Sequence, residues 1–194
     1  MENRESQVPN NRAQRQTPDM SADRDNFLTN LPNRCFEHLV SLTLRSCPGR
    51  HESRSHYHVT CRGNRRQAIF QDDDDRRRFL AVRDRVIRRY GWRLHAFCLM
   101  TNHFHLLVRT PQPNLSRGMQ RLNSEYAAYF NDRFGLVGHL FQQRFGSRLI
   151  ETAEYFDEAQ RYIAFNPVRA GLCQDPSEWP WSSFFGMSNF AFDR

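Results

Sequence analysis

The segment Trp92–Arg109 has the sequence WRLHAFCLMTNHFHLLVR, in which His103 and His105 flank the bulky apolar residue Phe104. The surrounding residues have the apolar content of buried strands, and side chains alternate between the two faces of a strand. We therefore expect both histidines to project from one face and Phe104 from the other. Two convergent imidazoles provide half of a binding site for a divalent metal. Because H-x-H also recurs by chance, as a pair of structural histidines, the rest of the chain must decide between the two interpretations.

A second motif lies downstream, in the sequence AQRYIAFNPVRAGL of Ala159–Leu172. The spacing of apolar and aromatic residues predicts a helix from Tyr155 to about Asn166, because Pro167 should end it. Tyr162 and Asn166 are four residues apart and share one helical face. A tyrosine beside a metal ion can act as a nucleophile, and an asparagine carbonyl can complete the metal's ligands. On its own, such a tyrosine is more often a half-buried packing residue.

Apolar periodicity and turn signals predict the other elements. The four acids Asp72–Asp75 favour the start of a helix that runs to about Tyr90, as a solvated capping run rather than as metal ligands. Asn114 is expected to cap a helix from Leu115 to about Arg133. Strands are expected at 56–62, 92–99, 103–110 and 145–151. The order β-α-β-β-α-β followed by α predicts an α+β fold, a ferredoxin-like antiparallel sheet with an appended C-terminal tyrosine-bearing helix.

Taken together, the motifs resemble the HUH single-strand DNA transposases that use one catalytic tyrosine, and within them the group called REP-associated tyrosine transposases. The resemblance covers about residues 56–186 through ordered blocks: YHVTCRGNRRQAIF, FCLMTNHFHLLV, LNSEYAAYFN, GHLFQQRF, YIAFNPVRAG and WPWSSF. Several blocks in one order are far more specific than any single block. The resemblance implies the same ferredoxin-like fold. It also implies a substrate of single-stranded DNA that carries small hairpins, formed by palindromic repeats.

Charge and composition agree with a polyanionic partner. The chain of 194 residues has 28 basic residues, all of them arginine, and a net charge of +7. Arginine binds phosphate through its planar guanidinium and stacks on bases, although a GC-rich genome would also favour arginine over lysine. Residues 1–54 carry only +1 of this charge and are rich in polar residues. We therefore expect a disordered N-terminal extension at 1–54, which departs from the family pattern, and a transposase domain at 55–194.

Cysteine use and hydropathy indicate the compartment. The five cysteines show no C-x-x-C spacing, no signal peptide is recognisable, and no apolar run reaches membrane-spanning length. We expect free thiols in a reducing bacterial cytoplasm, association with the nucleoid, and no membrane partner.

The chemistry expected of the site combines both motifs. A divalent cation, Mg²⁺ or Mn²⁺, held by His103, His105 and Asn166, would polarise the scissile phosphate. Tyr162 would attack phosphorus, leaving a 5′-phosphotyrosyl link and a free 3′-hydroxyl, and the reverse attack would complete strand transfer. Side chains expected to contact DNA phosphates, or else to be ordinary solvated charges, are Arg62, Arg65, Arg66, Arg144 and Arg148.

The sequence leaves several alternatives open. Tyr126 or Tyr155 could be the nucleophile, although its place in an apolar stripe favours packing for Tyr126 and the motif match favours Tyr162. The strand residues His58 and His95 could face the site or point away from it. The main functional alternative is a DNA-hairpin-binding protein that has lost strand transfer.

Two other enzyme classes fit less well. A replication initiator nickase would normally bring a helicase or origin-binding domain, for which the chain has no room. A metal-dependent hydrolase would need a water-activating carboxylate in the motif. The DNA target and the oligomeric state, monomer or homodimer, do not follow from the sequence.

Overall fold

The computed structural model describes residues 54–187, which contain four strands, three α-helices and two short 3₁₀ helices. The chain divides into two units, Met1–Leu42 and Thr43–Arg194, and the described residues all belong to the second. Except for Arg54, the extension predicted at 1–54 lies outside the described residues. Within 54–187, no helix is long and apolar enough to cross a membrane.

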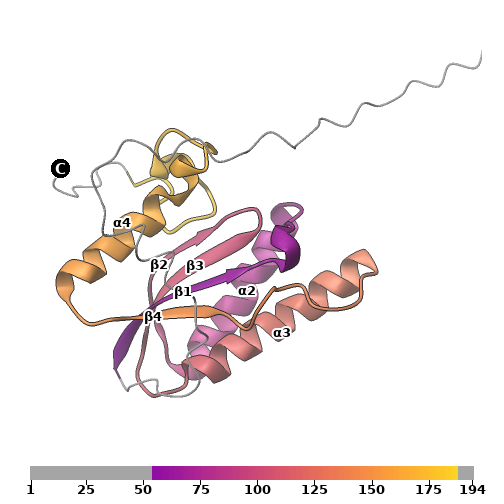
Figure 1. Ribbon diagram of the computed structural model, residues 1–194, viewed down its shortest axis with the longest axis horizontal. Coiled ribbons are helices and arrows are strands. Elements are labelled where there is room, and N and C mark those ends of the chain that lie inside the picture. The colour runs from indigo at the N-terminus through magenta and orange to yellow at the C-terminus, as the bar shows by residue number, and fades with distance from the viewer. Residues whose placement is uncertain (1–53, 188–194) are drawn as a thin grey trace, which may run out of the picture. The chain divides into compact units, whose positions relative to one another are not determined.

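A single antiparallel sheet lies at the centre of the described residues (Figure 1). The strand order is β2-β3-β1-β4, with β1 paired antiparallel to both β3 and β4. This order confirms the predicted ferredoxin-like sheet with an appended helix. The elements are β1 (Ser55–Arg62), α2 (Asp73–Tyr90), β2 (Arg93–Leu99), β3 (His103–Thr110), α3 (Leu115–Phe134), β4 (Gly146–Ile150) and α4 (Ala153–Arg169).

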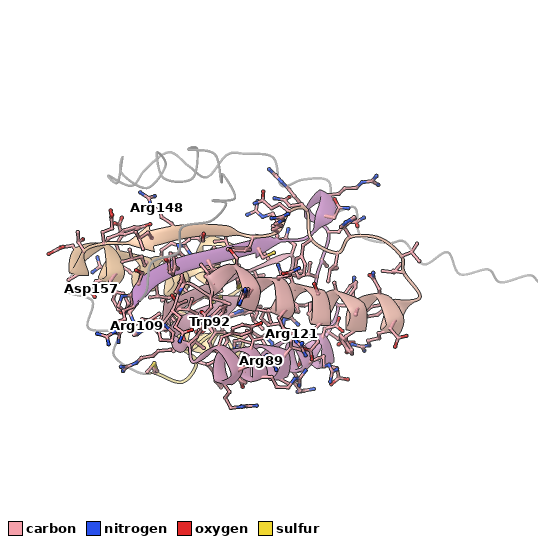
Figure 2. All side chains as sticks on the ribbon, turned by 90° about the horizontal axis from the view of Figure 1, so that it is seen from below. Arg89, Trp92, Arg109, Arg121, Arg148 and Asp157 are labelled. Carbon is pink, nitrogen blue, oxygen red and sulfur yellow. The ribbon has the colours of Figure 1, made fainter. Side chains whose placement is uncertain are left out.

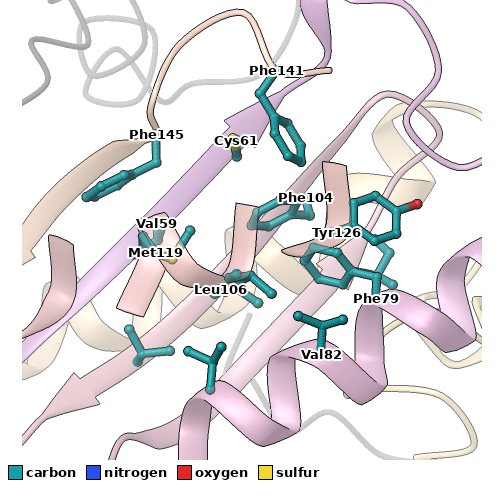
Figure 3. Close-up of a cluster of buried hydrophobic side chains, with 14 of the residues drawn as sticks. Val59, Cys61, Phe79, Val82, Phe104, Leu106, Met119, Tyr126, Phe141 and Phe145 are labelled. Atoms are coloured by element: carbon teal, nitrogen blue, oxygen red, sulfur yellow. The ribbon is translucent and has the colours of Figure 1, made fainter. Parts of the chain in front are cut away.

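Alternation along the strands separates two apolar layers. Phe104 and Leu106 of β3 pack under α2 and α3, together with Phe79 and Tyr126 from those helices (Figure 3). On the other face, Leu107 of β3 belongs to a second cluster built with α4 (Figure 1). On the α4 side of the sheet, His105 is buried, whereas His103 is partly buried. The layer between the sheet and α4 thus contains both predicted histidines.

The acidic run at the start of α2 behaves differently from the expectation. Asp72 caps the helix by accepting hydrogen bonds from the backbone N–H groups of Asp74 and Asp75. The prediction of a solvated run is wrong for Asp75, which is fully buried. The guanidinium of Arg133 contacts its carboxylate at 2.5 Å and also donates to Asp72. A buried carboxylate needs such a partner, so this pair fastens the end of α3 to the start of α2.

The start of α3 also differs in detail. The side chain of Asn114 makes no capping hydrogen bond to the helix. Its amide accepts from Trp92 Nε1 at 2.7 Å and donates to the Tyr90 carbonyl. The Trp92 indole lies against Gly118, where a Cβ would approach the ring to 2.1 Å. Asn114 therefore holds the Trp92 indole against Gly118, where any side chain larger than that of glycine would clash with the ring.

Helix α4 is longer than predicted and continues through Pro167 to Arg169. Proline here removes one backbone donor close to the helix end, where few hydrogen bonds depend on it. Beyond it, Ala170 N donates to Asn166 O and Leu172 N donates to Pro167 O. The proline ring is buried, so packing holds a conformation that the residue before a proline usually avoids. The longer helix brings Arg169 onto the same element as Tyr162.

The C-terminal described segment covers the free edge of β2. Leu99 N donates to the carbonyl of Trp181, and Ser183 N donates to the carbonyl of Phe97. Trp179 Nε1 donates to Leu99 O at 3.0 Å. An exposed edge strand is open to pairing with other chains, and this segment occupies it within the same chain.

Candidate active site

The register of the sheet places the two predicted histidines beside the end of β1. His103 lies opposite Arg62 and His105 opposite Thr60 in the β1–β3 pair. Both rings point toward α4, whereas Phe104 between them points into the other apolar layer. The imidazole centroids of His103 and His105 are 5.0 Å apart. The predicted convergence of the pair on one face is therefore observed.

A third imidazole, that of His58 in β1, joins the pair. Its Nε2 lies 3.0 Å from Nδ1 of His105, within hydrogen-bonding distance. His103 makes a different contact, because its Nδ1 lies 2.7 Å from Oδ1 of Asn102. The Nε2 of His105 is buried and has no hydrogen-bond partner among the described residues. A buried polar atom of this kind indicates a place for a ligand that the protein itself does not provide.

The electrostatics of this histidine cluster keep the rings neutral. Burial, together with the guanidinium of Arg148, lowers the pKa of His58 from its usual value to about 4. Burial and Arg62 lower the pKa of His103 to about 4 as well. For His105, burial and the two neighbouring imidazoles shift the pKa in the same direction. At neutral pH all three rings are uncharged, which is the form that coordinates metals.

Tyr162 of α4 lies over this cluster. Its phenol ring is edge-on to His105, with 5.5 Å between centroids, and to His58, with 5.7 Å. Arg169 comes from two turns further along the helix, and its guanidinium carbon lies 5.1 Å from the Tyr162 ring centroid. A cation over an aromatic face is attracted by the ring electrons. The structure thus brings the predicted nucleophile, both predicted histidines and one additional arginine together.

Asn166 lies one turn after Tyr162, as predicted, and its amide Nδ2 donates to the Tyr162 carbonyl at 2.9 Å. This bond turns Nδ2 back toward the helix, so Oδ1 is the atom that could bind a metal. Within residues 54–187, no three His, Cys, Asp or Glu side chains are grouped in a way that would hold a metal ion. A metal site here therefore depends on an amide ligand, or on the substrate, in addition to two imidazoles. This donor set fits a divalent cation that accepts nitrogen and oxygen ligands.

The five arginines predicted to contact DNA fall into two groups. Arg62 and Arg148 border the histidines, since each lowers the pKa of a histidine in the cluster. Arg148 also stacks on the ring of Tyr155, with 4.9 Å from its guanidinium carbon to the centroid. Figure 2 shows Arg148 on the opposite side of the sheet from Arg89 and Arg121, which belong to α2 and α3. Arg148 therefore lies on the α4 side of the sheet, as does Arg62, which is paired with His103 in the β1–β3 register.

The second group lies past the end of β1, in the short 3₁₀ helix η1 (Asn64–Arg66) and in a neighbouring loop. Arg65 and Arg66 are exposed and both have positive φ, 53° and 59°. The exposed Arg144 belongs to a neighbouring loop, because Asn64 N donates to Leu140 O and Gln142 N donates to Arg62 O. All three arginines thus lie near the end of the sheet where β3 begins with His103.

Comparisons with known proteins agree on the family and the fold. Residues 51–166 match the family described as "Transposase IS200 like". The chain belongs to this family. A protein of Haemophilus influenzae named as a REP-associated tyrosine transposase is 24% identical over 117 residues, which are 55% of this chain and 66% of that relative, just under two thirds. These findings confirm the resemblance drawn from the motifs.

One solved structure supports the fold of this family member, and a second is less similar. The structure of a REP-associated tyrosine transposase bound to a REP hairpin superposes with a TM-score of 0.60 at 21% identity, covering 72% of this chain and 83% of that one. A protein of Deinococcus radiodurans named as a transposase covers 60% of this chain and 95% of its own, with a TM-score of 0.44 at 19% identity.

The sequence leaves open whether His58 faces the candidate site, and it does not single out Asn102 or Arg169. Strand alternation places His58 on the same side as His56, but which sheet face that is depends on pairing with a strand about 45 residues away. Arg169 could have been found only by predicting that the helix continues through Pro167, which places Arg169 two turns after Tyr162.

The alternative nucleophile Tyr126 is fully buried, and its hydroxyl donates to Ile69 O at 2.6 Å.

Proposed function

We propose that this chain is a metal-dependent transposase that cleaves and rejoins single-stranded DNA at hairpin sequences through a 5′-phosphotyrosine intermediate. The observation that carries the proposal is the position of Tyr162 over the histidine cluster, between two imidazole rings and the guanidinium of Arg169. Membership of a transposase family supports the reaction class. The similar fold of a relative bound to a REP hairpin supports hairpin DNA as the substrate.

Three of the predicted residues bind the metal in this proposal. His103, His105 and Asn166 would hold a divalent cation, Mg²⁺ or Mn²⁺, through imidazole nitrogen and amide oxygen. When bound, the cation supplies Lewis-acid polarisation of the scissile phosphate and neutralises the charge that develops there. Low pKa values keep the imidazoles uncharged at neutral pH, so that each has one nitrogen available to a metal.

Tyr162 carries the covalent step. Its phenol oxygen attacks phosphorus and loses a proton, the bond from phosphorus to the 3′-oxygen breaks, and that oxygen takes up a proton to give a free 3′-hydroxyl. The DNA 5′-phosphate remains esterified to tyrosine. A 3′-hydroxyl of another strand end then reverses the step, so the phosphodiester energy is kept and no nucleotide is hydrolysed. Arg169 over the phenol ring places positive charge where the phenolate forms.

The arginines beside the site would bind the DNA backbone. Arg62 and Arg148 lie next to the histidines, and the loop residues Arg65, Arg66 and Arg144 extend the positive surface past the end of β1. Phosphate contacts of this kind fix the position of a strand without selecting its sequence. They suit a hairpin whose flanking single strand passes across Tyr162.

A covalent-adduct assay tests the proposal. Labelled single-stranded hairpin DNA is incubated with the protein and Mg²⁺ or Mn²⁺, then separated on a denaturing gel. We expect a slower band that protease digestion removes and a released fragment with a 3′-hydroxyl. Hairpin binding without any adduct or cleavage would instead support a binding protein that has lost strand transfer.

A further inference from the structure

Both histidines proposed as metal ligands use Nδ1 for a contact within the protein. His103 Nδ1 lies 2.7 Å from Asn102 Oδ1, and His105 Nδ1 lies 3.0 Å from His58 Nε2. A neutral imidazole carries one proton, and only its unprotonated nitrogen can bind a cation. The partner of Nδ1 therefore decides whether Nε2 is available to a metal.

For His103 the hydrogen-bonding network determines where the proton is. The amide of Asn102 donates through Nδ2 to the carbonyl of Arg66 at 3.0 Å, which turns Oδ1 toward His103. An amide oxygen can only accept, so Nδ1 of His103 must be the donor. A neutral His103 consequently has an unprotonated Nε2.

For His105 the contact with His58 allows two arrangements. If His58 Nε2 donated, the His105 proton would sit on Nε2, which is buried and has no hydrogen-bond partner among the described residues. That arrangement leaves a buried donor that a cation cannot satisfy. If His105 Nδ1 donates instead, its Nε2 is an unprotonated nitrogen, and His58 carries its own proton on Nδ1. The second arrangement leaves a buried acceptor instead, which a bound cation can satisfy through the nitrogen lone pair.

We propose that His58 and Asn102 are positioning residues that hold His103 and His105 as Nδ1–H tautomers, with both Nε2 atoms directed to one cation. The inference rests on the metal site of the proposed function and adds which ring atoms bind. Metal-binding histidines generally donate their other ring N–H to a fixed acceptor, which sets tautomer and ring orientation. Here one acceptor is an amide and the other is a third imidazole.

Asn102 has a second consequence for the site. It holds the carbonyl of Arg66, whose backbone is in the left-handed region, as is that of Arg65. Left-handed conformations of residues other than glycine persist only where the surroundings enforce them. The amide that orients His103 therefore also fixes the loop that presents two exposed arginines beside it.

Nitrogen spectra of the metal-free protein test the tautomers directly. With ¹⁵N-labelled histidine at pH 7.5, long-range ¹H–¹⁵N correlations distinguish protonated from unprotonated ring nitrogens. We expect the signals of His103 and His105, assigned through single substitutions, to show protonated Nδ1 and unprotonated Nε2. Protonated Nε2 on either ring in the wild type would overturn the proposal, whatever the protein's activity.

Metal affinity provides a second, independent measurement. Calorimetric titration with Mn²⁺ should show about 10- to 100-fold weaker binding for Asn102→Ala and for His58→Leu, the usual effect of removing such a partner. His58→Gln should bind within a few-fold of wild type, because its amide oxygen can accept from His105. His56→Leu is the matched control on the same strand and face, and should bind as wild type does.

The outcomes distinguish a failure of the positioning role from a failure of the metal site. Wild-type affinity in both Asn102→Ala and His58→Leu, or equal losses in His58→Leu and His58→Gln, would overturn the positioning role. Loss of affinity in the His56→Leu control as well would mean general disturbance of the layer under α4 and would also overturn it. If wild type binds no Mn²⁺, the metal site of the proposed function fails, whereas the nitrogen spectra still decide the tautomers.

Discussion

The phenol ring of Tyr162 lies edge-on against the imidazole of His105, with 5.5 Å between the ring centroids and 84° between the planes. The two residues are 57 positions apart in the chain and come from an outer helix and a central strand. Their contact depends on α4 crossing the face of the sheet on which His103 and His105 project. The proposed nucleophile and the proposed metal ligands thus meet only in the folded protein.

The first prediction concerns this nucleophile. Tyr162→Phe removes the attacking oxygen and keeps the ring that packs against His105 and His58. The melting temperature and hairpin binding should stay close to wild type, and the covalent adduct should disappear from a denaturing gel. Tyr155→Phe is the matched control, since it removes a hydroxyl from the same helix two turns earlier. Adduct formation by Tyr162→Phe would show that another residue attacks.

The second prediction concerns the metal. Replacing His103 and His105 together by alanine removes both imidazole ligands, so Mn²⁺ binding by calorimetry and DNA cleavage should both be lost. Chelation of the wild type should also abolish cleavage. The pair His56 and His95 supplies a matched control, because its ring centroids lie 5.1 Å apart and both rings contact Phe156 of α4. Equal metal binding by wild type and by the His103/His105 double variant would place the metal elsewhere.

Local patterns in the sequence predict much of the fold and part of this site. Strand alternation predicts that His103 and His105 share a face, and helical spacing predicts that Tyr162 and Asn166 do. Both expectations concern residues within one element, where geometry depends only on the backbone period. The motif blocks then predict the family, which the comparisons confirm.

Side-chain contacts between different elements do not follow from local patterns in the sequence. The burial of Asp75 depends on Arg133, which is 58 residues away at the far end of another helix. The role of Asn114 depends on the Trp92 indole, and Asn102 binds a carbonyl in a loop 36 residues earlier. These side chains are polar and short, so propensity favours a cap or a turn for each of them. Tertiary contacts decide otherwise, and a single sequence carries no signal for them.

The third prediction concerns the pH dependence of stability without metal. Folding lowers the pKa of both His58 and His103 to about 4 from the usual 6.5. Between these values the unfolded chain binds more protons than the folded protein, so the free energy of unfolding should fall as pH falls from about 7 to 4. Melting temperatures measured across this range should decline. In His58→Gln the decline should be shallower, and an unchanged slope would contradict the lowered pKa of His58.

The fourth prediction concerns residues 1–54, whose place in the protein stays a prediction. They carry +1 of the +7 net charge and contain no long periodic apolar segment. Such a segment cannot bury enough apolar surface to offset the entropy of ordering it. A chain starting at Ser55 should remain soluble and cleave hairpin DNA at the wild-type rate. A large fall in melting temperature on truncation would show that the segment Phe36–Leu44 packs on the domain.

The last prediction concerns the form of the substrate. Tyr162 is half-buried between α4 and the histidine cluster, so a scissile phosphate must come close to the sheet to be attacked. The paired strand of a duplex hinders that approach, whereas a single strand can follow the arginines past the tyrosine. We therefore expect cleavage of single-stranded hairpin DNA and little or no cleavage of the same sequence annealed to its complement.

Salt provides a further check on the same substrate. Phosphate neutralisation by arginine releases counterions, so hairpin affinity should fall steeply between low and moderate salt. Replacing the exposed pair Arg65 and Arg66 by glutamine should weaken binding. It should also reduce the slope of log K against log salt concentration by up to about two. Replacing Arg89 and Arg121, on helices that cover the other face of the sheet (Figure 2), is the matched control and should change neither. Equal cleavage of duplex and single strand, or equal effects of the two arginine pairs, would contradict this arrangement of DNA on the protein.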